Sequence, residues 1–139
     1  MKTLIKNAQI VNEGKIFKSD LLIEDRIIKK IANSINEKVD KSIDAEGLHL
    51  IPGVIDDQVH FREPGLTQKA DIYTESKAAI AGGITSFMEM PNTNPQTLTQ
   101  KLLEEKFRIG DKKSLANFTF FMGVSNNNLE EVLKTDPKN

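Results

Sequence analysis

The stretch GVIDDQVHF, residues 53–61, decides the fold because it begins a regular alternation of two kinds of segment. It reads as a strand, and DIYTESKAAIAGG at residues 71–83 follows with the Ala and Ile spacing of an amphipathic helix. We expect Gly82 or Gly83 to end that helix, because glycine tolerates the left-handed conformation of a helix C-terminus. The next run, ITSFMEM at residues 84–90, predicts a second strand.

The alternation continues along the rest of the chain. PNTNP at residues 91–95 is a loop, and residues 97–112 predict a second helix. Four side chains of that helix fall at helical spacing: Leu102, Leu103, Lys106 and Phe107. We interpret the charge-rich LEEKFRIGDKK at residues 103–113 as its solvated face. ANFTFFMGV at residues 116–124 predicts a third strand, and NNLEEVLK at residues 127–134 begins a third helix.

This order of elements limits the topology. Successive strand and helix units require parallel strands with right-handed crossovers, either in an open doubly wound sheet or in a closed β/α barrel. A barrel of eight such units needs about 250 residues. If the fold is a barrel, we therefore expect residues 53–139 to hold only its first three units.

Residues 1–52 have a different pattern, which predicts a small β-domain. Two runs rich in Ile and Leu, TLIKNAQIV at residues 3–11 and DLLIEDRIIKKI at residues 20–31, read as a β-meander around the turn-like NEGK. KSIDAEGLHLIPG at residues 41–53 continues in this style and ends in Pro-Gly, which marks a natural boundary. We expect two domains, residues 1–52 and 53–139.

Composition excludes several classes of function. With 38% hydrophobic and 28% charged residues the chain is globular, and its net charge of −1, without a run of basic residues, argues against a nucleic-acid partner. The N-terminal residues do not form a signal peptide, and no run approaches a membrane span, so we expect a cytoplasmic protein. The absence of cysteine excludes thiolate metal ligands, which leaves His49 and His60 as the nitrogen ligands.

A set of polar side chains follows the strand predicted at residues 53–61. Because alternate residues of a strand share a face, Asp56, Gln58, His60 and Arg62 are expected to project together. Asp57 points the other way by the same rule. The C-terminal end of a parallel strand is where β/α proteins place their sites, since the loops there vary without disturbing the core.

At residues 52–95 these features combine into a recognisable whole. The motifs HFREPG, AGGIT and MPNTNP at this spacing resemble the N-terminal part of the dihydroorotases, in the cyclic-amidohydrolase branch of the amidohydrolase superfamily. The resemblance extends over residues 1–139. It implies a small N-terminal β-domain, part of a composite β-sandwich, followed by a truncated (β/α)8 TIM barrel of the metal-dependent hydrolases.

The resemblance implies a zinc site with one or two ions. The family carries Asp-x-His-x-His at the end of its first barrel strand; His60 matches the second histidine, and Gln58 replaces the first. Gln58 has two readings, a variant ligand in an active subfamily or a mark of lost catalysis. The bridging carboxylated lysine, two further histidines and the catalytic aspartate of the family come from later strands, so we expect no catalytic residue within this chain and no activity of the chain alone. His49 is interpreted as structural.

Arg62 and Asn92 match the family's substrate-carboxylate residues. A guanidinium fork pairs a carboxylate in bidentate fashion, and an amide adds one donor. The resemblance thus implies hydrolysis of dihydroorotate to N-carbamoyl-L-aspartate, with ring closure as the biosynthetic direction of pyrimidine synthesis. Without the motif, Arg62 would read as a surface ion pair, Asn92 as a turn residue and His60 as an ordinary core or surface histidine.

Two alternatives remain open at this point. The first is a non-catalytic dihydroorotase-like scaffold, of the kind that associates with aspartate transcarbamoylase, which Gln58 favours and Arg62 and Asn92 oppose. The second is an allantoinase or dihydropyrimidinase; allantoinases carry Asn at the position of Arg62. A homo-oligomer is also possible. Three units of a barrel leave strand edges and apolar faces uncovered, so we expect poor solubility or dependence on partners.

Overall fold

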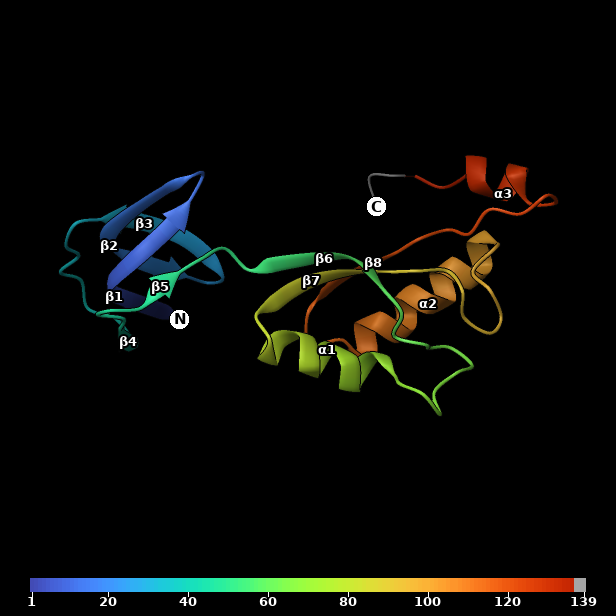
Figure 1. Ribbon diagram of the computed structural model, residues 1–139, viewed down its shortest axis with the longest axis horizontal. Helices are drawn as coiled ribbons and strands as arrows, with labels where there is room; N and C mark the ends of the chain where they lie inside the picture. The colour runs from blue at the N-terminus through green and yellow to red at the C-terminus, as the bar shows by residue number, and fades with distance from the viewer. Residues whose placement is uncertain (137–139) are drawn as a thin grey trace. The chain divides into compact units, whose positions relative to one another are not determined.

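The computed structural model describes residues 1–136, which form two compact units (Figure 1). The first unit ends at Pro52, and the second begins at Gly53 and continues to the end of the described residues. No helix among residues 1–136 is long and apolar enough to cross a membrane.

The first unit is a five-stranded sheet. Its strands are β1 Lys2–Asn12, β2 Lys15–Glu24, β3 Ile27–Ala32, β4 Lys41–Asp44 and β5 His49–Leu50. β1, β2 and β3 are antiparallel neighbours, as the meander predicts, and positive φ angles at Asp25 and Arg26 form the turn that divides residues 20–31 into two strands. The prediction that residues 41–53 continue the meander is wrong, because β4 and β5 both pair with β1 in parallel. The segment between β3 and β4 returns the chain to the free edge of β1, where a strand running in the same direction can pair.

A buried carboxylate joins three segments of this unit. The register between β1 and β2 shifts between Ile5 and Ala8, where Asn7 has a φ of 60°. Asp20 accepts hydrogen bonds of 2.9 Å from the backbone N–H of Asn7 and of Ile35. These bonds lower the pKa of Asp20 against the opposing effect of burial. The carboxylate thus satisfies two backbone donors that the sheet leaves without partners.

The second unit alternates strands and helices. Its elements are β6 Val54–Val59, α1 Ile72–Ala81, β7 Ile84–Glu89, α2 Gln100–Lys113, β8 Asn117–Phe120 and α3 Leu129–Leu133. The three strands are parallel in the order β6-β7-β8, which confirms the parallel arrangement predicted from the alternation.

The two long helices begin and end at residues with suitable chemistry. Asp71 caps α1 by accepting from the backbone N–H of Thr74 at 2.9 Å, and the Thr74 hydroxyl returns a contact to the Asp71 N–H. Gly83, with a φ of 90°, takes the left-handed conformation after α1, as expected. The Thr99 hydroxyl caps α2 by accepting from Leu102 N–H at 3.2 Å.

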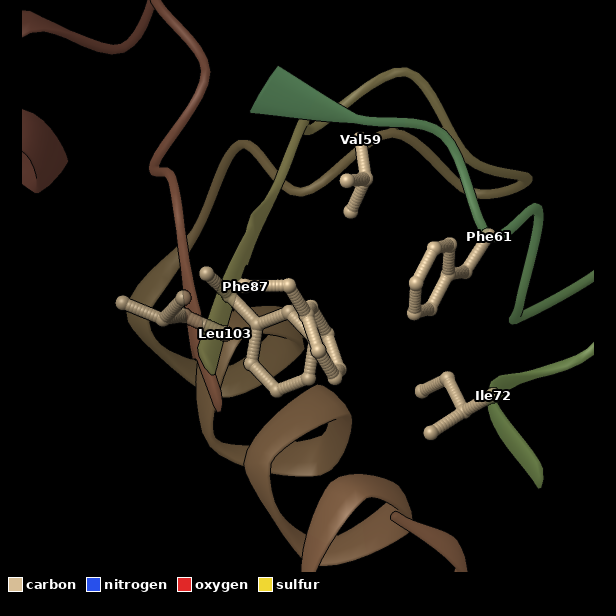
Figure 2. Packing of buried hydrophobic residues seen from close by; sticks show 6 residues of the cluster. Val59, Phe61, Ile72, Phe87 and Leu103 are labelled. Carbon is tan, nitrogen blue, oxygen red and sulfur yellow. The ribbon is translucent and has the colours of Figure 1, made fainter. Parts of the chain in front are cut away.

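Both helices pack on the same face of this sheet. Ile72 of α1 and Leu103 of α2 belong to one buried cluster with Phe87 of β7. Figure 2 shows Val59, Phe61 and Ile72 directed toward the space beside Phe87, and in Figure 1 α1 and α2 lie along one side of the strands. A doubly wound sheet carries helices on both faces, so this arrangement favours the barrel alternative.

Candidate functional site

The candidate site lies where β6 and β7 end. His60 follows the last residue of β6, and its Nδ1 is 2.9 Å from Oδ1 of Asn92, in the loop after β7. An amide oxygen only accepts, so Nδ1 carries the proton and donates, and a neutral imidazole then keeps its lone pair on Nε2. The contact brings together two residues that are 32 positions apart, and both are exposed.

The loops that carry these residues are packed against each other. The backbone N–H of Asn94 donates to the carbonyl of Pro64 at 3.1 Å. Gly65 has a φ of 83°, and a Cβ at this position would clash with the backbone carbonyl of Asn94. Each loop contains a cis X-Pro bond, Glu63-Pro64 in the first and Asn94-Pro95 in the second. The hydrogen bond between Asn94 and Pro64 and the close approach at Gly65 therefore place HFREPG and MPNTNP side by side.

Arg62 has an unusual backbone for a non-glycine residue. Its φ is 70°, and its carbonyl accepts from the N–H of Leu66 at 3.0 Å. The side chain is half-buried, and its guanidinium has no hydrogen-bond or ion-pair partner among residues 1–136. A fork of donors left open in this way can bind an anionic group.

The strand before His60 departs from simple alternation. Asp56 pairs with Phe87, and Val59 pairs with Glu89, so three steps along β6 match two along β7. In this bulge Asp56 accepts from Gln58 N–H at 3.2 Å. Asp56 lines a hollow with Val59 and Phe87, on the helix-covered side of the sheet. The prediction that Asp56 shares a face with Gln58, His60 and Arg62 is therefore wrong, because the bulge reverses the alternation.

The described residues do not make a metal site. No three His, Cys, Asp or Glu side chains among residues 1–136 are grouped closely enough to hold an ion. A catalytic zinc takes three protein ligands. His60 offers one imidazole, Gln58 offers a neutral amide that binds zinc less well than imidazole, and His49 lies in the first unit. A zinc ion does not fit the residues of this chain taken alone.

A buried acid fixes the loop that carries Arg62. Glu63 accepts from the backbone N–H of Ile72, at the start of α1, at 3.0 Å, and its other oxygen pairs with the ammonium of Lys113. The hydrogen bond that Lys113 donates to Glu63 is the main cause that raises the pKa of Lys113. Sequence reasoning identified Arg62 as a candidate but did not identify Glu63, although an acid placed before the start of a helix is a recognisable signal.

A fully buried ion pair joins the end of β7 to α2. Glu89, the last residue of β7, and Lys106 of α2 are each at most 1% exposed, and Lys106 Nζ lies 3.1 Å from Glu89 Oε2. Burial raises the pKa of Glu89 and lowers that of Lys106, and their mutual attraction opposes both shifts. The prediction that residues 103–113 form a solvated face is wrong at Lys106. Two features of the sequence could have indicated this burial. Lys106 falls at helical spacing with Leu102 and Leu103, and Glu89 is the single acid within the apolar run ITSFMEM.

Comparison with known sequences identifies the kind of protein that shares this arrangement. The family model described as dihydro-orotase-like matches residues 47–132. A dihydroorotase of Lactobacillus acidophilus is 37% identical over 133 residues, which are 96% of this chain and 31% of that protein. A dihydroorotase of Carboxydothermus hydrogenoformans is 52% identical over 97 residues, 68% of this chain and 23% of that protein. An allantoinase of Deinococcus radiodurans is 37% identical over 130 residues, covering 93% and 29%.

Solved structures give the same fold. An L-hydantoinase (dihydropyrimidinase) from Arthrobacter aurescens superposes with a TM-score of 0.90 at 30% identity, over 94% of this chain and 29% of that one. A D-hydantoinase superposes with a TM-score of 0.79 at 29% identity, over 95% and 30%. The chain spans less than a third of the length of each of these relatives.

Proposed function

Because the chain belongs to the dihydroorotase-like family, we propose that it forms part of a cyclic amidohydrolase that converts dihydroorotate to N-carbamoyl-L-aspartate, and in biosynthesis catalyses the reverse ring closure. The chain supplies the small β-domain and the first three units of a β/α barrel. The remaining units supply the catalytic groups. Helices on one face of parallel strands support this architecture.

The observation that carries the proposal is the pair of donors at the ends of β6 and β7. The guanidinium of Arg62 has no partner among the described residues. Asn92 turns its amide oxygen toward His60, which leaves its amide N–H groups free to donate. Dihydroorotate carries a carboxylate on its ring, and a guanidinium fork with an adjacent amide is suited to such a group. The two residues bind and orient the substrate by this end.

Zinc, implied by the family resemblance, would need ligands from outside the described residues, because those present do not complete a site. From this chain, His60 would contribute Nε2, since Nδ1 faces Asn92. Gln58 would lie beside the metal as a weak ligand or a hydrogen-bond donor. When bound, one or two zinc ions would supply an activated water for amide hydrolysis.

The test is replacement of Arg62 by alanine in the enzyme that contains this chain. The KM for dihydroorotate should rise about 100-fold, the effect of losing a charge-assisted bidentate contact. Arg108→Ala is the matched control, because Arg108 is an exposed arginine on α2 that pairs with Glu104 rather than with either loop. An unchanged KM in Arg62→Ala, with the control also unchanged, would refute the carboxylate role.

Two other functions compete with this proposal. The allantoinase relative and the hydantoinase structures favour a different cyclic amide, and Gln58 favours a scaffold without activity. Turnover of allantoin, hydantoin or dihydrouracil in preference to dihydroorotate would identify the first. The scaffold alternative is tested by measuring metal content and activity in the unaltered enzyme and in Gln58→His. Metal and activity that appear only in Gln58→His would identify a scaffold.

The cytoplasmic location remains a prediction of the sequence. Self-association and association with aspartate transcarbamoylase also remain predictions. Both partner predictions concern the whole enzyme, of which this chain corresponds to a minor part.

A further inference from the structure

The Glu89–Lys106 pair is buried more completely than any other ion pair of the described residues, and the proposed function does not use it. Neither oxygen of Glu89 completes a hydrogen bond with residues 1–136, although Lys106 Nζ is 3.1 Å away. The attraction is therefore electrostatic and incompletely aligned. Replacing such a pair by apolar side chains of similar size is often neutral or stabilising, so core stability alone does not explain it.

The contacts of the pair reach both loops of the candidate site. On one side, Glu89 pairs with Val59 at the end of β6, just before Phe61 and Arg62, and the backbone N–H groups of these two residues lower the pKa of the Glu89 carboxylate. On the other side, the Lys106 ammonium donates to the carbonyl of Met90 at 3.0 Å. Met90 lies two residues before Asn92, and its own N–H donates to Val59 at 3.0 Å. The two charges thus hold the backbone on which Arg62 and Asn92 are placed.

This support matters most at Arg62, which has a left-handed backbone, with a φ of 70°. A conformation of that kind is unfavourable for a residue with a side chain and persists only where the surroundings enforce it. A negative charge facing the N–H groups of Phe61 and Arg62 favours the orientation of this peptide segment. The aromatic ring of Phe120 adds to the enclosure of the cation, with Lys106 Nζ 5.0 Å from the ring centre.

We propose that Glu89 and Lys106 are positioning residues, which set the separation and orientation of Arg62 and Asn92 for the substrate carboxylate. The proposal rests on the proposed function of those two residues. It assigns the pair an effect on substrate binding that acts through the backbone of residues 61–62 and 90–92, without contact to the substrate.

The decisive variant is the double substitution Glu89→Gln with Lys106→Met, which removes both charges and leaves no unpaired ion in the core. Lys101→Met is the matched control, since Lys101 is an exposed lysine on the same helix. The measurements are KM and kcat for dihydroorotate, the thermal midpoint, and hydrogen exchange of the peptides that cover residues 60–66 and 90–95, all in the enzyme that contains this chain.

We expect the double variant to keep a thermal midpoint close to that of the unaltered enzyme, while its KM rises about tenfold with a smaller change in kcat, the pattern of lost ground-state binding. Both loops should exchange faster than in Lys101→Met. A double variant that folds with unaltered KM and unaltered loop exchange would overturn the proposal, because the pair would then serve the core alone.

Two further outcomes keep the test decisive. If the double variant does not fold, Glu89→Asp replaces it: the charge pair is kept but the carboxylate is withdrawn by one methylene from the N–H groups of Phe61 and Arg62, and faster exchange at residues 60–66 is again required. If the unaltered enzyme turns over no dihydroorotate, the proposed function fails by itself. Loop exchange in the variants still tests the positioning of Arg62 and Asn92.

Discussion

Asp20 and Glu89 are the most completely buried carboxylates of the two units among the described residues, and they behave in opposite ways. Asp20 of the first unit is 3% exposed and accepts hydrogen bonds from two backbone N–H groups, which lower its pKa. Glu89 of the second unit is fully buried, completes no hydrogen bond with the described residues, and has a raised pKa because desolvation is its largest effect. Backbone hydrogen bonding is the largest effect at Asp20 and desolvation is the largest effect at Glu89, so the two pKa values shift in opposite directions.

The difference separates a structural acid from one associated with a site. The Asp20 carboxylate replaces sheet partners for Asn7 and Ile35, and no further requirement on it is evident. Glu89 carries its charge in the buried interior, where Lys106 is the only ion-pair partner among the described residues. Groups with strained electrostatics of this kind concentrate near functional sites, and the ends of β6 and β7 are such a place.

The largest effect should come from removing one charge of the Glu89–Lys106 pair. Lys106→Met leaves Glu89 buried without a counter-ion, which costs about 3–5 kcal/mol of the free energy of unfolding. Hydrogen exchange of the peptides that cover β7 and α2, in the enzyme that contains this chain, measures this loss in the second unit. A loss below about 1 kcal/mol would mean that Glu89 takes up a proton at negligible cost.

A smaller loss in the free energy of unfolding is expected from changing Asp20, the acid whose hydrogen bonds are complete. Asp20→Asn keeps one acceptor but turns an amide N–H toward the second backbone donor, so the first unit should lose about 2 kcal/mol. Hydrogen exchange of residues 2–35 measures this loss locally. Leu50 packs beside a different cluster in the same unit, which contains neither Asn7 nor Ile35, and Leu50→Ala serves as a control that removes apolar contact without touching the hydrogen bonds. Faster exchange at Asn7 and Ile35 in Asp20→Asn alone would locate the effect.

Acid should act on the two units in opposite directions through these groups. The folded pKa of Asp20 lies below its ordinary 3.8, so its contribution to stability is complete above that value and is lost as the pH falls through the folded pKa. The folded pKa of Glu89 lies above its ordinary 4.5, so ionisation lowers stability as the pH rises from 4.5 to the folded pKa, and acid relieves this loss.

The measurement is hydrogen exchange of both units between about pH 6 and pH 3, corrected for the intrinsic pH dependence of exchange and compared with Asp20→Asn and Glu89→Gln. Asp20→Asn should remove the acid sensitivity attributable to that group in the first unit. Glu89→Gln should remove the opposite trend in the second, where Lys106 is the facing charge. Parallel acid profiles in the unaltered units would contradict the comparison.

The sequence predicted the second unit better than the first for a physical reason. Periodicity indicates which face of a segment is buried, and this information was sufficient to predict the parallel strands and the helices after residue 53. It does not report which strand a short segment pairs with, so the parallel pairing of β4 and β5 with β1 was missed. It also assumes unbroken alternation, which the bulge after Asp56 defeats.

At the candidate site, the sequence indicated His60, Arg62 and Asn92 through a resemblance, and the structure adds that His60 and Asn92 are in contact. Their roles remain proposals. The buried pair was missed because charge-rich composition is a statistical sign of exposure. Lys106 is an exception that only the packing of α2 against β7 reveals.

The smallest expected effect concerns the other charges of α2. Arg108 and Glu104 form an ion pair of 2.6 Å one turn apart, yet their side chains are 66% and 65% exposed. Water screens such a pair, so Arg108→Ala should change the free energy of unfolding by less than about 0.5 kcal/mol. The distance between the charges is shorter here than in the Glu89–Lys106 pair. A larger loss in Arg108→Ala than in Lys106→Met would show that ion-pair distance outweighs burial, and the contrast between the two buried carboxylates would then need another cause.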